Sequence, residues 1–596
     1  MNNIPKYAKA LATIALVLCI TTSTFAHDIE VDNIFYKIKD NTAKTVSVTY
    51  HSLVSKDDSY KYSGDILIPA SLTHNETTYT VTGIDSDAFN KCENLTSVSI
   101  PNTVTEIGRY AFYYCTKLSS VSIPNTVTTI NYATFAGCSS LTSITIPNSV
   151  KTICYTAFYG CSSLSSITIP ASVKSIEEQA FSECNSLSSI IVDSDNPVFD
   201  SRDNCNAIIK TASNTLVAGC NKTIIPNTVT SIGASAFTAC FGLTNIAIPN
   251  SVTTIGDYAF STCIDLVSIT IPKSVTNIGS CVFMSCINLD SIIVEDGNTY
   301  YDSRENCNAL IKTSTNTLIA GCNNTVIPNT VTSIQYYAIA YCNRLASITI
   351  PNSVTNIEQK AIHSCPKLSS ITVENGNSIY DSRENCNAII ETASNSLLLG
   401  CINSTIPSSI TKIESYAFSN CKDLVTIDIP STVTDIGSYA FNICANLESI
   451  IIPNSIERLS AGIFYGCHNL SSITLPSSML SIGNYAFNNC SNIRSIYCQA
   501  STPPYYSMIF ADEVYQNATL FIPQGCKSAY ENTKPWKNFH NIVETDFSEN
   551  ESIKPDKNTP TEIARFDISG HKLHKPTSGI NIIVMSDNTI KKVIVK

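Results

Sequence analysis

Cysteine is the residue type whose spacing in this sequence most clearly suggests chemistry. Six of the 25 cysteines form three pairs, each with its members 15 residues apart: Cys205 and Cys220, Cys307 and Cys322, and Cys386 and Cys401. Within the first pair, two apolar runs flank a polar Thr-Ala-Ser-Asn turn, which predicts a β-hairpin. A turn centred between Ala212 and Ser213 would place the two cysteines directly opposite each other. The three pairs are candidate disulfides, and reduced, packed thiols are the alternative.

A second set of cysteines recurs in register, three residues after a position that is usually Phe. The set comprises Cys92, Cys115, Cys138, Cys161, Cys184, Cys240, Cys263, Cys286, Cys342, Cys365, Cys421, Cys444, Cys467 and Cys490. We interpret these residues as small buried hydrophobic side chains. A continuous ladder offers no unique disulfide pairing. No local C-x-x-C motif or His partner accompanies them, so we expect no metal site.

Each hairpin is preceded by an Asp-Ser-Arg-[Asp/Glu]-Asn cluster, at residues 200–204, 302–306 and 381–385. Carboxylate and amide oxygens bind calcium, but Arg202, Arg304 and Arg383 would repel a cation at the centre of each cluster. Pairing of each Arg with the preceding Asp is the structural interpretation. Arg is also favoured at interface anchors, so the three arginines are candidate interaction residues as well.

Motifs for catalysis are absent from the sequence. The histidines are isolated, no G-x-S-x-G elbow occurs, and no Gly-rich loop could hold a phosphate. We therefore expect no enzyme, no catalytic residue and no cofactor.

A repeat positions all of these residues. Ile-Pro pairs begin at Ile100, Ile123, Ile146 and Ile169, and the same 23-residue step returns after each of three insertions of 33 residues. A fixed short period predicts a solenoid, because one such unit cannot bury its own apolar face and must stack on its neighbours. We predict a mostly β repeat solenoid of leucine-rich-repeat-like coils. It would have a parallel β-sheet, short helical turns at the Ala-Phe segments, three inserted β-hairpins and a small C-terminal β domain.

The strand of each coil alternates apolar, polar and apolar residues, as Val121, Ser122 and Ile123 do. The polar position should point outward and form a broad sheet face. Its members include Ser99, Ser122, Thr145, Thr168, Thr270, Thr349 and Thr474. None is aromatic, which favours a protein partner over a glycan, since sugar faces stack on aromatic rings.

The repeated pattern L-x-x-[IV]-x-I-P-x-x-[VI]-x-x-I, followed by Ala-Phe and Cys, resembles the BspA-like, or Treponema-type, leucine-rich repeat over residues 83–497. The resemblance implies a bacterial surface protein that binds or adheres to extracellular proteins or cells. Residues 27–82 resemble the N-terminal β cap of such proteins, and residues 498–544 resemble their C-terminal cap.

The two ends of the chain are read as targeting signals. A basic start, an apolar stretch at residues 10–20 and Thr24-Phe25-Ala26 predict a cleaved signal peptide over residues 1–26. Residues 545–560 form a predicted linker. Residues 561–596 resemble the sorting domain of type IX secretion cargo of Bacteroidota. Beyond the signal peptide no apolar run reaches membrane-spanning length. We expect a secreted or outer-membrane cell-surface protein.

Composition narrows the class of partner. The net charge of the 596 residues is −11 and only 14% of them are charged, against a usual share of about 25%. Because nucleic-acid binding needs clustered Lys and Arg, we expect no nucleic-acid partner. The leading hypothesis is a binding or adhesion module for extracellular or host matrix proteins or cell surfaces. The alternative is a glycan-binding protein or a purely structural spacer.

Overall fold

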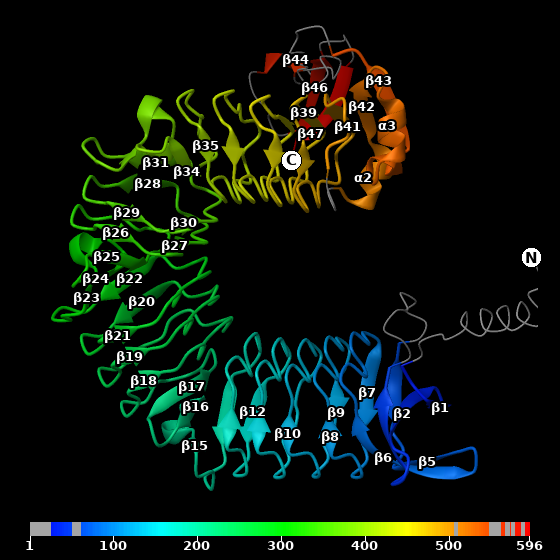
Figure 1. Cartoon of the computed structure of the whole chain (residues 1–596). Helices are drawn as coiled ribbons and strands as arrows, with labels where there is room; N and C mark the ends of the chain where they lie inside the picture. Colours follow the sequence, from blue (N-terminus) through cyan, green and yellow to red (C-terminus); the bar gives the residue numbers. More distant parts are fainter. Residues whose placement is uncertain are drawn as a thin grey trace, which may run out of the picture. The chain divides into compact units, whose positions relative to one another are not determined.

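The computed structural model describes residues 26–50, 61–505 and 510–547, together with the backbone of four strands between residues 562 and 595. The predicted signal peptide and most of the predicted linker lie outside the described residues. The chain forms two compact units: Met1–Leu368 with Val373–Ile379, and Ser369–Thr372 with Tyr380–Lys596. In both units, short parallel strands are stacked coil upon coil (Figure 1).

The first unit begins with a sheet in the order β1-β2-β3-β6-β5. Its strands are β1 (Ile29–Val31), β2 (Ile34–Asp40), β3 (Thr45–Thr49), β5 (Ser71–His74) and β6 (Thr77–Ile84). Strand β6 pairs in parallel with β8 (Glu106–Ile107) of the first coil, and β4 (Gly64–Leu67) pairs with β7 (Leu95–Ser99), which pairs with β9 (Ser120–Val121). The N-terminal sheet therefore continues directly into the repeats.

Two parallel ladders confirm the 23-residue coil. In one, β10 (Thr129–Ile130), β11 (Thr152–Ile153) and β13 (Ser175–Ile176) pair so that Thr129, Thr152 and Ser175 stand side by side. In the other, which carries the sheet face, β12 (Ser166–Ile169) pairs with β14 (Ser189–Val192), and β20 (Ser268–Ile271) pairs with β22 (Ser291–Val294). Alternate residues of these strands are buried, as in a sheet with one covered face.

The Ala-Phe segments are hydrogen-bonded turns, so the expected short helical turns are wrong in this detail. The N–H of Phe112 donates to the carbonyl of Thr134 in the next coil (2.8 Å), whereas the N–H of Tyr113 donates to Tyr110 in its own coil (3.1 Å). A helix would keep all of these bonds within its own segment. The alternation instead lets each turn satisfy the backbone of its neighbour.

The Phe side chains form a stack through the core. Phe89, Phe112, Phe135, Phe158 and Phe181 lie with ring centroids 5.0–5.6 Å apart and nearly parallel planes. A second stack contains Phe237, Phe260 and Phe283. In the second unit, Phe418, Phe441, Phe464, Phe487 and Phe510 repeat the arrangement. The first interruption, between Phe181 and Phe237, falls where an insertion enters the chain. Between Phe283 and Phe418 lie the other two insertions and two coils that have Ile339 and Ile362 at the Phe position.

The three insertions are hairpins, as predicted, and each is built into the ladder. In the first, β15 (Phe199–Asp200), β16 (Ala207–Lys210) and β17 (Thr215–Gly219) pair in antiparallel order. The last of these, β17, then begins a parallel ladder that continues through β18 (Ser231–Ile232), β19 (Thr254–Ile255) and β21 (Asn277–Ile278). A short 3-10 turn, η2 (Arg202–Asn204), links β15 to β16. The second strand of the hairpin therefore takes the place of a coil strand.

The other two insertions repeat this topology. The second contains β23 (Tyr301–Asp302), η3 (Arg304–Asn306), β24 (Leu310–Lys312) and β25 (Thr317–Ala320). The coils that follow it contain β26 (Ser333–Ile334), β27 (Ile339–Ala340), β28 (Ser347–Ile350), β29 (Asn356–Ile357), β30 (Ile362–His363) and β31 (Ser370–Val373). The third, in the second unit, contains β32 (Tyr380–Asp381), η4 (Arg383–Asn385), β33 (Ala388–Glu391) and β34 (Ser396–Gly400), followed by β35 (Lys412–Ile413) and β36 (Asp435–Ile436).

The second unit ends in a sheet in the order β37-β39-β41-β42-β43. Its strands are β37 (Ser449–Ile451), β39 (Ser472–Leu475), β41 (Ser495–Cys498), β42 (Thr519–Pro523) and β43 (Asn541–Thr545), and β38 (Arg458–Leu459) pairs with β40 (Ser481–Ile482). The unit also contains α2 (Asp512–Asn517), α3 (Lys527–Asn532) and η5 (Trp536–Asn538). The buried Trp536 donates its indole N–H to the carbonyl of Pro504 (2.9 Å), and Phe510 contacts Tyr515 and Phe539 edge-on. Aromatic residues thus close this end of the Phe stack.

The C-terminal segment contains an antiparallel sheet in the order β45-β44-β46-β47. Its strands are β44 (Glu562–Phe566), β45 (Lys572–Leu573), β46 (Gly579–Met585) and β47 (Ile590–Val595). In the described parts of the chain, no helix is both long and apolar enough to cross a membrane.

Candidate functional site

The predicted sheet face is exposed at six of the seven named positions. Ser99, Ser122, Thr145, Thr168, Thr270 and Thr349 are all exposed. Thr474 is the exception, with 9% of its surface accessible. It stands in register with Ile451 on one side and Tyr497 on the other, and Tyr497 stacks on Phe521 (4.7 Å). The larger neighbours exclude solvent from the short Thr side chain, so Thr474 is not an interaction residue.

An open groove of about 880 Å³ lies on the sheet face of the first unit. Thr145 and Thr168 line it, which places two predicted surface residues at one site. Ser143, Ser166, Asn125, Asn148 and Asp193 add polar groups, and Ile144, Ile146 and two prolines contribute apolar surface. Hydroxyls and amides both donate and accept hydrogen bonds, so the groove can contact a partner's backbone as well as its side chains.

The groove lies where the sheet is interrupted. Strands β7 and β9 belong to one sheet and β12 and β14 to another, and residues 142–147 between them form no strand. Residues 141–147 keep the same alternation of apolar and polar residues as residues 118–124 and 164–170 of the neighbouring coils, so this alternation does not predict the interruption. On the other side of the same coils, β10, β11 and β13 remain paired. The local opening therefore belongs to the sheet face alone.

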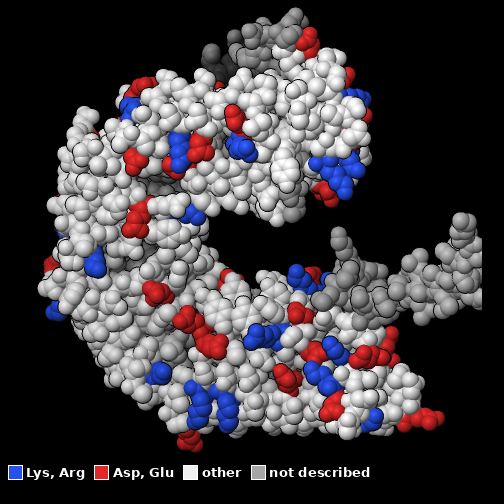
Figure 2. Space-filling view, viewed as in Figure 1, with Lys and Arg blue, Asp and Glu red and all other residues white. Residues whose placement is uncertain are grey.

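Charge on the molecule is sparse. In the view of Figure 2, acidic and basic side chains are few and form small, scattered groups among uncharged residues. Asp193 is the one charged residue that lines the groove. A partner would therefore be held there by hydrogen bonds and surface complementarity, which salt screens only weakly.

The three insertion arginines lie in hydrogen-bond networks within their own insertions. The Arg202 guanidinium donates to both carboxylate oxygens of Asp200 (2.7 and 2.5 Å) and to the Asn214 side chain (2.9 Å). Arg304 makes the same contacts with Asp302 and Asn316, and Arg383 with Asp381 and Asn395. About a quarter of each Arg side chain is exposed. The structural pairing expected from the sequence is present in all three insertions.

The Asp–Arg pairing also lowers the pKa of the aspartate. Burial alone would raise the pKa of Asp200, but hydrogen bonds from Arg202 and Thr211 hold that pKa below its ordinary value. Asp381 behaves in the same way beside Arg383. Both carboxylates therefore stay charged at neutral pH and keep their arginines in place.

The hairpin cysteines are not opposite each other, so the predicted register is wrong. A β-bulge between Ile208 and Ile209 shifts the pairing by one residue, so that Ala207 faces Gly219 and the next position brings Cys220 level with Asn206. The Cys220 thiol donates to the Asn206 carbonyl (3.4 Å) and the Cys205 thiol to that of Ala207 (3.7 Å). Cys205, Cys220, Cys307, Cys322, Cys386 and Cys401 are all buried free thiols.

The ladder cysteines make a contact that packing alone did not predict. In nine coils the thiol donates to the carbonyl of the Phe located 26 residues earlier, at 3.0–3.2 Å. Burial raises the pKa of Cys184 and of Cys286 to about 12. Cys184 and Cys286 therefore stay protonated and act as hydrogen-bond donors between coils.

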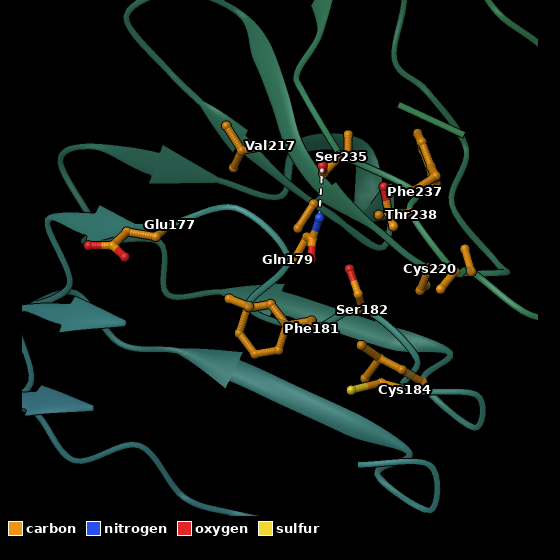
Figure 3. A pocket seen from close by; sticks show the side chains of 17 residues that line it. Glu177, Gln179, Phe181, Ser182, Cys184, Val217, Cys220, Ser235, Phe237 and Thr238 are labelled. Carbon is orange, nitrogen blue, oxygen red and sulfur yellow. Dashed lines mark hydrogen bonds between the residues drawn. The ribbon is translucent and has the colours of Figure 1, made fainter. Parts of the chain in front are cut away.

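A small cavity marks the gap in the Phe stack at the first insertion. It has a volume of about 20 Å³ and lies between Phe181 and Phe237, where the Gln179 amide donates to the Ser235 hydroxyl (3.4 Å; Figure 3). Such a volume holds about one water molecule. Ligand pockets are typically some 300–1,000 Å³, so this cavity is a packing gap and not a ligand site. Among the described residues, no group of three or more His, Cys, Asp or Glu side chains is arranged to hold a metal ion.

The repeats match a known family. The model of the BspA type leucine rich repeat region matches residues 71–206, 215–318, 316–397 and 388–516, which together make up well over half of the chain. The chain belongs to the BspA type leucine-rich repeat family. This assignment agrees with the family that the repeat pattern resembled. No curated protein matches the chain.

Several solved structures are similar to this BspA type protein. A leucine-rich repeat protein from Bacteroides ovatus has 24% identity, covering 79% of this chain and 94% of that chain, with a TM-score of 0.33. A leucine rich cell surface protein from Faecalibacterium prausnitzii has 26% identity with the same coverage and a TM-score of 0.30. A leucine-rich repeat protein from Eubacterium ventriosum has 23% identity, covering 68% and 92% of the two chains, with a TM-score of 0.40.

Sequence reasoning missed one surface of this BspA type protein. Tyrosines occupy the turns beside the Phe stack, and eight of them have positive φ angles: Tyr110, Tyr114, Tyr258, Tyr337, Tyr341, Tyr416, Tyr439 and Tyr485. The available signal was a Tyr two residues before or after the Phe position.

Proposed function

We propose that this BspA type leucine-rich repeat protein is secreted or displayed at the cell surface and binds an extracellular protein, of the host matrix or of another cell, through its sheet face. The observation that supports the proposal most directly is the groove lined by Thr145 and Thr168. It offers many hydrogen-bonding groups on a broad, exposed and nearly uncharged surface, as a binding module requires. A non-catalytic role accords with membership of a repeat family.

The two ends of the chain support the proposed location outside the cell or at its surface. The predicted signal peptide over residues 1–26 directs export, and the segment over residues 561–596 resembles a type IX secretion sorting domain. The four-stranded sheet of β44–β47 supports a small separate β module at that end. We propose that these two segments carry the protein across both membranes.

Binding is tested with the mature chain, residues 27–596, against a panel of purified extracellular matrix proteins. We expect Thr145→Lys with Thr168→Lys to weaken binding about tenfold, because two long charged side chains would fill the groove. The matched control is Thr270→Lys with Thr349→Lys, which changes two equally polar positions of the sheet face away from the groove. Equal affinity of both double variants would disprove the groove as the binding site.

The arginines provide a second comparison. If Arg202, Arg304 and Arg383 are all changed to Ala, we expect a lower melting temperature and retained binding, because each Arg is bound within its own insertion. Lost binding with an unchanged melting temperature would instead assign the interface to the insertions.

A further inference from the structure

Six tyrosines from three consecutive coils form one cluster on the turn side of the first unit: Tyr110, Tyr113, Tyr114, Tyr132, Tyr155 and Tyr159. We call this cluster the tyrosine patch. Tyr132 contacts Tyr110 edge-on (5.0 Å) and stacks on Tyr155 (5.8 Å). Tyr113 contacts both Tyr110 (5.3 Å) and Tyr114 (4.5 Å). The rings are half-buried or exposed, and Tyr114 is 42% exposed.

The fold itself does not require aromatic residues at two of these positions. Tyr110 and Tyr114 have φ angles of 56° and 54°, a left-handed conformation that is unfavourable for bulky residues. In the next two coils the position of Tyr110 is occupied by Ala133 and Thr156, and that of Tyr114 by Gly137 and Gly160. Small residues thus serve the same turns. Such backbone strain at a bulky residue is retained where the side chain serves a function.

Hydrogen-bonding groups border the rings. The Tyr155 hydroxyl donates to the Gln179 side chain (2.9 Å), and the Tyr159 hydroxyl donates to the Glu183 carboxylate. Burial and then Glu183 raise the pKa of Tyr159, and smaller contributions from Tyr114 and Tyr113 place it beside those rings. The rings of three coils are therefore bordered by their own hydroxyls and by the amide and carboxylate groups of the next coil.

The border of the patch carries both signs of charge. Lys91, Arg109 and Asp87 lie on one side of the patch, and three carboxylates, Glu177, Glu178 and Glu183, lie on the opposite side next to Tyr155 and Tyr159. The acidic side disfavours a polyanion, and the two basic residues on the other side disfavour a uniformly cationic ligand. The combination of ring faces and neutral hydrogen-bonding groups suits a ligand that has C–H faces and hydroxyls but no charge.

We propose that the tyrosine patch binds a neutral glycan. The C–H face of a sugar would stack on an exposed ring such as Tyr114, and its hydroxyls would exchange hydrogen bonds with the tyrosine hydroxyls and the Gln179 and Glu183 side chains. Because the rings recur from coil to coil, successive sugars of one chain would contact successive coils. This site lies outside the groove of the sheet face and is independent of the function proposed above.

The test uses the mature chain and a panel of neutral hexasaccharides of glucose, mannose and N-acetylglucosamine, with heparin as the anionic comparison, measured by calorimetry. We expect at least one neutral hexasaccharide to bind and heparin to bind no better. Tyr114→Asn should weaken binding about tenfold, since the stacking ring is lost, whereas Tyr114→Phe should retain most of it. The melting temperature of Tyr114→Asn should be unchanged or higher, because Asn tolerates positive φ.

The matched control is Tyr258→Asn, which removes a ring with the same exposure of 42% and a φ of 56° outside the patch. It should bind like the wild type, as should the Thr145→Lys, Thr168→Lys variant of the sheet face. The proposal is overturned if the wild type binds none of the neutral glycans or prefers heparin. It is also overturned if Tyr114→Asn lowers the melting temperature and keeps binding, since the ring would then be structural, or if Tyr258→Asn weakens binding equally.

Discussion

At the scale of single residues, burial determines the chemistry of the cysteines. Nine of the ladder thiols are buried and donate hydrogen bonds to Phe carbonyls of the preceding coil, and burial raises the pKa of Cys184 to about 12. The thiolate is the reactive form, so a thiol with a raised pKa in a closed core reacts slowly. Among the described residues, Cys154, Cys281 and Cys526 outside the ladder are only partly buried, as is Cys240 within it, but burial holds the pKa of the Cys240 thiol well above its ordinary value.

We therefore predict a sharp division in thiol reactivity. When the native protein is treated with iodoacetamide at pH 8, Cys526, Cys281 and Cys154 should be alkylated first, while the ladder and hairpin cysteines require denaturant. Peptide mapping by mass spectrometry distinguishes the two groups. Recovery of Cys205 bridged to Cys220 without added oxidant would contradict the free thiols of the structure.

One buried histidine should make the first unit sensitive to acid. His363 is 8% exposed and lies between Tyr337 and Tyr341, and burial, followed by the nearby Lys360, lowers its pKa to about 4. An unfolded His titrates near 6.5, so between pH 6.5 and 4 the unfolded chain binds the proton and the folded chain does not. The contribution of His363 to stability is complete above pH 6.5. It falls as the pH drops towards 4, by up to about 3 kcal/mol.

The prediction is checked by melting temperatures at pH 7 and pH 4.5. The wild type should lose more stability over this interval than His363→Phe, which keeps an aromatic ring but has no titratable group. Parallel losses in the two proteins would assign the acid sensitivity to other groups.

At the scale of elements, each insertion fits into the stack through a glycine. At Gly219, in β17, an added Cβ would lie 2.1 Å from the Phe237 ring, and Gly400, in β34, faces Phe418 at the same distance. Only glycine, which has no Cβ, lets the hairpin strand approach the next coil this closely. This contact explains how a coil without its own Phe remains part of the solenoid.

We predict that Gly219→Ala destabilises the first unit by about 1–3 kcal/mol, because Phe237 and the hairpin must move apart. The control is Gly83→Ala, where the nearest atom to the added Cβ is 3.5 Å away and stability should be unchanged or slightly higher. Urea denaturation of the two variants measures the difference. A Gly219→Ala protein as stable as Gly83→Ala would show that the hairpin packs loosely.

At the scale of the whole molecule, we expect the repeat region and the two predicted targeting segments to have separate tasks. The predicted linker over residues 545–560 is polar, and among the strands that the structure describes the C-terminal sheet pairs only within β44–β47. The tail should therefore be dispensable for folding and necessary for delivery.

We predict that deletion of residues 562–596 leaves the repeats folded but retains the protein inside the outer membrane of a host with type IX secretion. Cell fractionation and circular dichroism of the purified product measure the two properties. As a control, residues 561–596 fused to an exported reporter should bring that reporter out of the cell. Normal arrival of the truncated protein outside the cell would refute the sorting role.

The sequence by itself determined the period, the buried positions and the family of this protein. Ile, Val, Leu, Phe and Cys return every 23 residues, and because each coil has the same spacing, stacking buries the same positions in every coil. The Asp-Arg pairing in the insertions was also predictable, since the two residues lie two positions apart in one turn. These features depend on local spacing, which a linear chain already contains.

Only the tertiary structure decided the features that depend on contacts between coils. Hydrogen bonds from one coil to the next made the Ala-Phe segments turns, and a bulge shifted Cys220 away from Cys205. Larger neighbours on adjacent strands buried Thr474, and the sheet opened at residues 142–147 although their pattern matches that of paired coils. The physical reason is the same in each case. The register of neighbouring strands, their separation and the burial of their side chains are set by contacts with other strands and coils, which a local sequence pattern does not report.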